Sequence, residues 1–274
     1  GWVANDDVGM VGISGPGIAQ RFVAWAQPPL LAGGAPMSVI DEAYVGVGSA
    51  LKAMAGRRDF LLVGDSKLVS YPNLRALERA GVTFIAPLGA ARVPAGLFAG
   101  LDLAAARPVD YIAARDAGKP PEQRCRYRVS EDTMTMTGPR RADPVLHLRR
   151  ILVHSSANQS AAAHARALKL DKARIELDTL TRTAGTRHHP DADAVTRRAD
   201  QIATTRRVKA YLHAQITTDP TTGAPTFAWH FDQQTIDAEA ATDGWYALLS
   251  NLPPTDADTG EAIAEAVLGA ADEA

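Results

Sequence analysis

The chain has few aromatic residues and a single cysteine, and it contains no long apolar run. Cys125 alone, among 274 residues, excludes an internal disulfide framework and a zinc site built from cysteines. No run of about 18 apolar residues occurs, so we expect no transmembrane helix. The first residues show no basic segment followed by an apolar core, which is how a secretory signal begins. We therefore expect a cytoplasmic protein.

The chain does have an uneven distribution of charge. The whole sequence has a net charge of −2, but residues 122–209 contain 18 Lys and Arg against 10 Asp and Glu, a net charge of +8. A basic segment in an otherwise acidic chain is a candidate polyanion-binding surface, and a solvated helical face with Arg–Glu pairs is the alternative. The candidate contacts to a polyanion such as DNA are paired arginines of this segment: Arg140, Arg141, Arg197, Arg198, Arg206 and Arg207.

Residues 37–87 alternate between helical and strand patterns. We expect a short strand and a helix within 37–56, a buried strand over 60–63, and an amphipathic helix over 71–80 that ends at Gly81. A second strand is expected over 82–86. This alternation indicates an α/β layered domain. Residues 1–36 are punctuated by Gly and Pro and match no element clearly.

The segment 88–156 favours strands. Residues 97–106 suggest a helix and 109–116 a strand, followed by a loop. Residues 124–137 alternate basic with apolar or hydroxyl residues, which predicts exposed-face strands with a turn near 138–144. Another strand of the same sheet is expected from Val145.

Residues 157–213 predict a helical hairpin that is basic on its outside. The turn between its helices contains His188 and His189, which we interpret as a polar loop tip, with metal binding beside Asp191 and Asp193 as the alternative. The first helix has apolar residues at helical spacing: Ala167, Leu170, Ile175, Leu177 and Leu180. A β-hairpin over 214–231, a short helix near 233–242 and a strand over 243–252 complete the prediction.

Three interpretations compete at Gly64-Asp65-Ser66-Lys67. Asp65 follows the strand 60–63, and a carboxylate at the carboxyl end of a strand is well placed to bind a divalent metal. Ser66 could instead be the nucleophile of a serine hydrolase, but that chemistry needs a base and the chain contains no Asp-x-x-His. In the third interpretation Asp65 only caps the turn into the following helix.

Two stretches carry a resemblance to a known family. Residues 58–87 (RDFLLVGDSKLVSYPNLRALERAGVTFIAP) and, far downstream, 242–254 (TDGWYALLSNLPP) resemble the DDE transposases of bacterial insertion sequences, in the long-insert branch of the insertion sequence 4 superfamily. The intervening sequence is similar to that branch as well, so the resemblance covers roughly residues 50–252.

The resemblance implies a ribonuclease H-like catalytic core with a large insertion. Residues 37–87 and 242–274 would form part of this core, and 88–241 would be the inserted domain. In this family two aspartates and a glutamate hold Mg²⁺ for cleavage and strand transfer at transposon ends, and Asp65 matches the second aspartate. The partners implied are DNA and, in addition, a second copy of the chain in a homodimer.

The rest of the family pattern is not found. Asp7 is a remote candidate for the first aspartate, and residues 1–36 do not match its usual surroundings. The family's glutamate lies in a Tyr-x-x-Arg-x-x-x-Glu helix, whereas Glu265 and Glu273 have neither the Tyr nor the Arg before them. We therefore expect an incomplete transposase that is inactive as this chain, and a non-catalytic DNA-binding or interaction fragment is the alternative.

Overall fold

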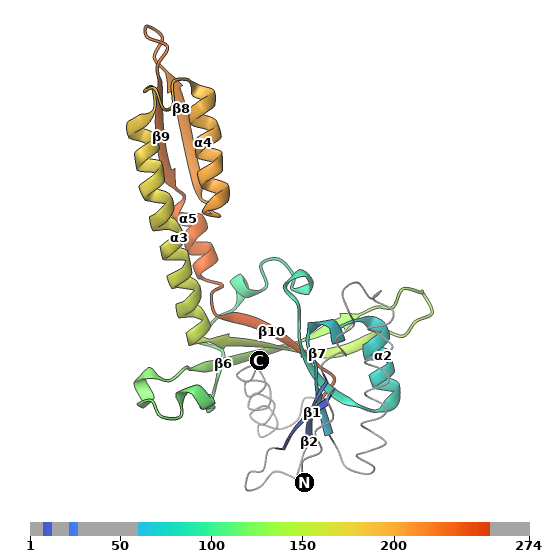
Figure 1. The fold of residues 1–274 in the computed structure, drawn as a ribbon. Coiled ribbons are helices and arrows are strands. Elements are labelled where there is room, and N and C mark those ends of the chain that lie inside the picture. The colour runs from blue at the N-terminus through green and yellow to red at the C-terminus, as the bar shows by residue number, and fades with distance from the viewer. Residues whose placement is uncertain (1–7, 13–21, 27–59, 253–274) are drawn as a thin grey trace. The chain divides into compact units, whose positions relative to one another are not determined.

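The computed structural model describes residues 8–12, 22–26 and 60–252 of the chain. These residues form a mixed α/β structure that divides into two compact units (Figure 1). Unit 1 comprises the described residues up to Leu97, then Leu101–Ser156, and those from Trp245 onward. Unit 2 comprises Ala157–Gly244 and the short segment Phe98–Gly100. The predicted α/β class is confirmed.

Unit 1 is built on a mixed sheet with the strand order β1-β2-β3-β4-β10-β7-β6-β5. β3 is parallel to both of its neighbours, β2 and β4, whereas the other neighbouring pairs are antiparallel. The strands are β1 (Val8–Gly12), β2 (Phe22–Ala26), β3 (Phe60–Val63), β4 (Thr83–Pro87), β5 (Arg107–Val109), β6 (Tyr127–Met136), β7 (Leu146–Ser155) and β10 (Trp245–Ser250).

The helix α2 (Tyr71–Ala80) has the bounds that its sequence predicts. The Ser70 side chain accepts a hydrogen bond from the Asn73 backbone N–H and so caps the first turn. Gly81 ends the helix with a φ of 61°, a left-handed conformation that glycine adopts without steric cost. The helix packs alongside β4 and buries Leu74 and Leu77.

The core of unit 1 forms where strands distant in sequence meet. Leu61 and Val63 of β3 share one apolar cluster with Ile151 and Val153 of β7 and Leu248 of β10. Side chains alternate between the two faces of a strand, so a short apolar strand such as β3 contributes to both sides of the sheet. Short 3₁₀ helices connect the strands: η1 (Ser66–Leu68), η2 (Ala90–Arg92), η4 (Ala114–Asp116) and η5 (Pro121–Gln123).

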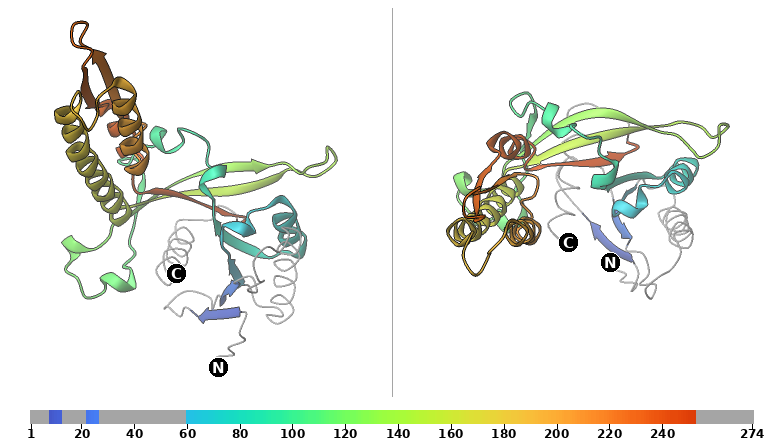
Figure 2. Two further views of the ribbon diagram at one scale, coloured as in Figure 1. Left: turned by 45° about the horizontal axis from the view of Figure 1, so that its top comes forward. Right: turned by 90° about the horizontal axis from the view of Figure 1, so that it is seen from above.

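Unit 2 combines long helices with a β-hairpin. Its helices are α3 (Ser156–Thr183), α4 (Ala192–Thr205) and α5 (Gln233–Ala240), and its hairpin strands are β8 (Leu212–Thr218) and β9 (Pro225–Phe231). The hairpin lies alongside α3 and α4 in Figure 1 and in the left view of Figure 2. Leu177 of α3, Ile202 of α4 and Phe227 of β9 belong to the apolar core between them. The predicted helical hairpin, β-hairpin and short helix are confirmed.

Two sequence predictions in unit 1 are wrong. Residues 97–106 form no long helix, and only the 3₁₀ turn η3 (Phe98–Gly100) occurs there. The Asp102 carboxylate accepts a hydrogen bond from the Ala104 backbone N–H at 2.8 Å, a local turn that competes with helix formation. The predicted strand over 109–116 is also wrong, because β5 ends at Val109 and η4 follows.

The buried face of α3 differs from the predicted one. Leu177 and Leu180 are buried as expected, but Ala167 is exposed and Ile175 is 67% exposed. Arg166 is buried instead, with 7% of its surface accessible. One basic residue of the hairpin is therefore packed inside it, which the sequence pattern did not predict.

Candidate functional site

Asp65 lies at the carboxyl end of β3, directly after Gly64. The Gly64 backbone N–H donates to the Ile85 carbonyl at 3.0 Å, which holds the end of β3 against β4. A Cβ on residue 64 would lie 2.5 Å from Leu68 Cδ2, so a side chain there would force the following turn away from the strand. Glycine at this position therefore allows the chain to turn sharply and to present Asp65 at the edge of the sheet.

Asp65 also caps the short helix η1. Its Oδ1 accepts a hydrogen bond from the Lys67 backbone N–H at 2.9 Å, which is the contact expected if the aspartate only terminates the turn. An ionised carboxylate can accept about four hydrogen bonds or metal contacts. The capping bond and metal coordination by Asp65 are therefore chemically compatible, and Asp65 remains partly exposed.

The acids that could join Asp65 in a metal site lie elsewhere in the sequence. Among residues 8–12, 22–26 and 60–252, no cluster of three or more His, Cys, Asp or Glu side chains is arranged to hold a metal ion. Asp7, Glu265 and Glu273 lie outside the described residues. Ser66, the alternative nucleophile, is exposed and begins η1.

The six candidate DNA-contacting arginines fall into two groups. Arg140 and Arg141 lie in the exposed loop between β6 and β7, and Arg197 and Arg207 are exposed in unit 2. The two remaining arginines, Arg198 and Arg206, are engaged within unit 2, as described next.

Glu176 of α3 accepts hydrogen bonds from two of the predicted DNA contacts. Its Oε2 lies 2.8 Å from Arg198 Nη2 and its Oε1 lies 2.6 Å from Arg206 Nε. One carboxylate thus offsets part of the charge of two arginines. Here the alternative interpretation of the basic segment, a helical face with Arg–Glu pairs, describes the contacts observed.

The paired histidines occupy the turn between α3 and α4. His188 is exposed and His189 is half-buried, and the His189 carbonyl accepts a hydrogen bond from the Gly185 N–H at 2.9 Å. This agrees with the predicted polar loop tip.

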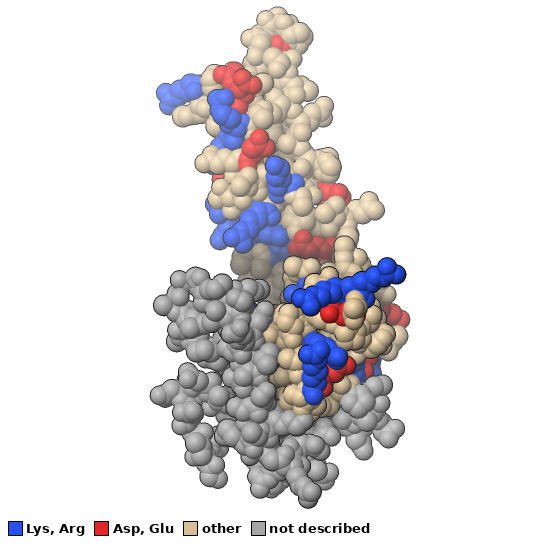
Figure 3. Space-filling view, turned by 90° about the vertical axis from the view of Figure 1, so that its right-hand side faces the viewer, with Lys and Arg blue, Asp and Glu red and all other residues tan. Residues whose placement is uncertain are grey.

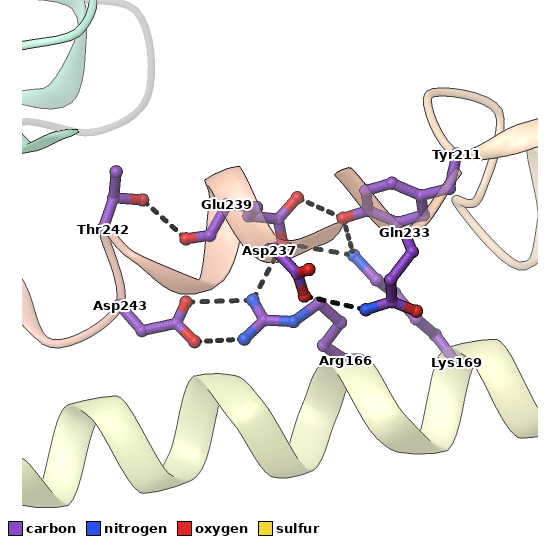
Figure 4. Close-up of polar contacts among 8 residues, drawn as sticks. All are labelled: Arg166, Lys169, Tyr211, Gln233, Asp237, Glu239, Thr242 and Asp243. Carbon is purple, nitrogen blue, oxygen red and sulfur yellow. Dashed lines mark hydrogen bonds and ion pairs between the residues drawn. The ribbon is translucent and has the colours of Figure 1, made fainter. Parts of the chain in front are cut away.

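A polar cluster in unit 2 was not predicted from the sequence (Figure 4). Arg166 of α3 donates two hydrogen bonds to Asp243, one of them 3.0 Å long, and a third of 3.3 Å to Glu239. The Tyr211 hydroxyl donates to Glu239 and accepts from Lys169 Nζ at 2.8 Å. Asp243 belongs to the second stretch that resembles transposases, and here it holds the end of unit 2 against α3.

The cluster shifts the ionisation of its members. The hydrogen bonds to Asp243 raise the pKa of the Arg166 guanidinium further above its usual value. Burial acts to raise the pKa of Glu239, but the Tyr211 hydrogen bond and the charges of Lys169 and Arg166 outweigh it and lower that pKa. Burial and the bond to Glu239 raise the pKa of the Tyr211 phenol. These shifts favour the ion pairs over their neutral forms.

Helical spacing is the signal that could have located Arg166. The packed positions of α3 are the buried Arg166, Ala173, Leu177 and Leu180 and the half-buried Leu170, all apolar except Arg166 and spaced at intervals of three and four residues. A charged residue in register with such a stripe lies on the packed face. It then requires a partner, because an unpaired buried charge is costly.

No helix in the described part of the chain is both long enough and apolar enough to cross a membrane. Comparison of the chain with protein-family models, with curated proteins and with solved structures found no match.

Proposed function

We propose that this chain is an incomplete DDE-type transposase that binds DNA, with Asp65 at the position of one of the family's metal-binding acids. One observation carries the proposal. Asp65 leaves the end of a strand that has a parallel neighbour on each side, and β4, the next strand, pairs with β10. Both stretches that resemble the family therefore meet in one sheet, although unit 2 separates them in sequence. A ribonuclease H-like core interrupted by an insertion would bring them together in this way.

Mg²⁺ fits the chemistry of Asp65. Hard divalent cations prefer carboxylate oxygens combined with phosphate oxygens, and Asp65 offers a partly exposed carboxylate at the end of β3. The remaining candidate acids, Asp7, Glu265 and Glu273, lack the sequence surroundings that the family has at its other two positions. When bound, the metal would activate water and stabilise the leaving oxygen of a phosphodiester. Within the protein, Gly64 and the β3–β4 hydrogen bond hold Asp65 in place.

DNA affinity would come mainly from exposed arginines. Arg140, Arg141, Arg197 and Arg207 are exposed, and contacts of this kind to phosphates release counterions, so that binding weakens as salt rises. A filter-binding titration of the purified chain with duplex DNA in increasing NaCl tests this. We expect binding at low salt that declines steeply. Absence of duplex binding at low salt would contradict the proposal.

Catalysis is tested separately. The sequence after Trp245 contains no Tyr-x-x-Arg-x-x-x-Glu, so we expect the chain to bind DNA without nicking it. Transposon-end DNA incubated with the chain and Mg²⁺ should stay intact. Nicking that requires Mg²⁺ and is lost in Asp65→Ala would show instead that the chain is an active transposase.

A second candidate function is a non-catalytic interaction module. Leu168 and Ile175 of α3 are 46% and 67% exposed and lie seven residues apart, on one face of the helix. Exposed apolar side chains on one face suit contact with another protein. This candidate predicts that Asp65→Ala changes no activity, whereas Leu168→Glu with Ile175→Glu abolishes partner binding. Pull-down of a full-length transposase by each variant distinguishes the two functions.

A further inference from the structure

Unit 1 contains a groove of about 600 Å³ between α2 and the loop that joins β6 to β7. Arginines line both walls: Arg75 and Arg79 from the helix and Arg140 from the loop. Arg75 and Arg79 are one helical turn apart, so their side chains share one face of α2. Figure 3 shows Lys and Arg side chains on the side of unit 1 that carries α2.

The two walls of the groove are fixed to each other. The Tyr71 hydroxyl at the start of α2 donates to the Pro144 carbonyl of the loop at 2.7 Å. A Cβ on Gly138 would lie 2.6 Å from the Tyr71 ring and 2.4 Å from Asp143, so the loop approaches the helix as closely as glycine permits. The groove is thus formed before any ligand binds, which limits the ordering cost of binding.

One arginine that lines the groove has a donor without an acceptor. Within the described part of the chain, Arg75 Nε is buried and has no hydrogen-bond acceptor, although Arg75 Nη1 contacts Glu78. Asp143 accepts from the Arg140 backbone N–H at 2.9 Å rather than from its guanidinium. A buried donor without an acceptor destabilises the protein by about 1–3 kcal/mol, so an anion that reaches Arg75 would gain from satisfying it.

We propose that this groove binds phosphates along one strand of a nucleic-acid backbone. The inference rests on the proposed binding of DNA and adds Arg75 and Arg79, which precede the basic segment 122–209, to Arg140 within it. One helical turn separates these residues by about 6 Å along the axis. Two nucleotides of a DNA strand rise about 7 Å, so adjacent guanidiniums can reach nearby phosphates. Arg is suited to this role because its planar fork contacts phosphate oxygens in pairs.

Salt dependence of binding to a short random-sequence duplex tests the groove. The variants are Arg79→Ala, the triple variant Arg75→Ala/Arg79→Ala/Arg140→Ala, and the same triple change to Lys. Arg92→Ala is the matched control, because Arg92 is also an exposed arginine of unit 1 but lies outside the groove. Circular dichroism establishes that each variant is folded.

Each lost phosphate contact lowers the slope of log K against log salt by about 0.9. We expect a decrease of about 0.9 for Arg79→Ala and about 2.7 for the triple Ala variant, with more than tenfold weaker binding at low salt. The Lys variant should keep most of the slope, since Lys also contacts phosphates as a point charge. Arg92→Ala should leave the slope unchanged.

The possible outcomes separate the two proposals. If the wild-type chain binds duplex DNA and the triple Ala variant binds with the same affinity and slope, the groove proposal is wrong and the proposed function stands. If the wild-type chain binds no duplex at low salt, both are wrong. If poly-glutamate competes for the groove as well as a duplex of equal charge, the occupant is an acidic protein and the nucleic-acid assignment is overturned.

Discussion

Arg166 places a full charge on the packed face of α3, and its ion pair with Asp243 offsets the cost of burying that charge. The two side chains are 7% and 8% exposed and share two hydrogen bonds. Burying an ion pair stabilises little relative to an apolar pair, whereas removing one partner leaves an uncompensated charge. The pair therefore specifies how α3 meets the end of unit 2 more than it adds to stability.

Arg166→Ala should lower the unfolding free energy of unit 2 by about 3–5 kcal/mol, because Asp243 is left buried without a partner. Amide hydrogen exchange of α3 in increasing urea measures this locally. The double variant Arg166→Met/Asp243→Leu should recover most of the loss. Arg174→Ala is the control, since Arg174 pairs with Asp171 where both are exposed, and it should change nothing measurable. If Arg166→Ala and Arg174→Ala lowered the unfolding free energy of unit 2 equally, this account would be contradicted.

Glu239 predicts how unit 2 responds to acid. Its pKa is lowered in the folded protein, so its contribution to stability is present above the unfolded value of about 4.3. That contribution is lost as the pH falls through the lower, folded pKa. Hydrogen exchange of α5 should therefore accelerate more between pH 5 and pH 3 in the wild type than in Glu239→Gln, after correction for intrinsic rates. Asp171→Asn, at an exposed site, should behave as the wild type does.

At the scale of elements, the pairing of β10 with β4 is extended by the side chain of the residue that follows β10. Asn251 follows β10, and its Oδ1 accepts from the Phe84 N–H at 2.8 Å while its Nδ2 donates to the Val82 carbonyl at 2.9 Å. The amide thus continues the ladder after the strand ends. Ser250 adds a hydrogen bond to the Phe84 carbonyl at 2.6 Å.

Asn251→Ala should destabilise unit 1 by about 2 kcal/mol, because two backbone groups of the β4 segment lose their partners. The urea dependence of hydrogen exchange in β4 measures the effect. Gln123→Ala, an exposed amide of unit 1 in η5, should change it by no more than a few tenths of a kcal/mol. If Asn251→Ala and Gln123→Ala lost similar amounts of stability, the two hydrogen bonds of Asn251 would contribute no more than an exposed amide does.

Elements with strong local signals are those that the sequence predicts. Phe60–Val63 is an uninterrupted apolar run, and α2 lies between a capping Ser70 and Gly81. The strand prediction for residues 109–116 is wrong because a contact with a residue outside the segment determines their structure. The buried Asp116 carboxylate accepts from the Cys125 N–H at 2.8 Å and from Lys119 Nζ at 2.7 Å, which folds the segment into a turn. No pattern within the segment indicates that pairing.

The same distinction between local signals and contacts from elsewhere in the chain applies to the candidate site. The placement of Asp65 after β3 could be predicted because it depends on an adjacent strand, and its capping bond to Lys67 is local as well. The groove of unit 1 could not be predicted, because it depends on a contact between Tyr71 and a loop 73 residues away in sequence. Charge counting also overestimated the free arginines, since it cannot show that Glu176 contacts both Arg198 and Arg206.

At the scale of the whole molecule, the main segment of unit 2, Ala157–Gly244, is continuous in sequence, and its two ends join neighbouring strands of unit 1. His154 of β7 is the register partner of Trp245 of β10, and the chain leaves unit 1 after Ser156, two residues beyond His154, and re-enters it at Trp245. A two-residue turn can join antiparallel strands at such a pair. A short turn could therefore join β7 to β10 in place of unit 2.

Replacing residues 155–244 by Asn-Gly should leave a folded unit 1, because Asn-Gly favours the turn that a two-residue hairpin requires. Amide hydrogen exchange should show β3, β4 and β6 still protected. As the control, Gly-Gly at the same junction should fold with lower stability, since it fixes the turn less well. An unprotected sheet in both variants would mean that unit 2 is required for unit 1 to fold.

This attachment also determines how the chain would respond to mechanical tension. A pull applied along β7 and β10 would shear the ladders beside them rather than peel them apart one bond at a time. β7 has ten register pairs with β6, whereas β10 has three with β4. Tension would therefore separate β10 from β4 first, and the two hydrogen bonds of the Asn251 amide reinforce the sheet at that shorter join.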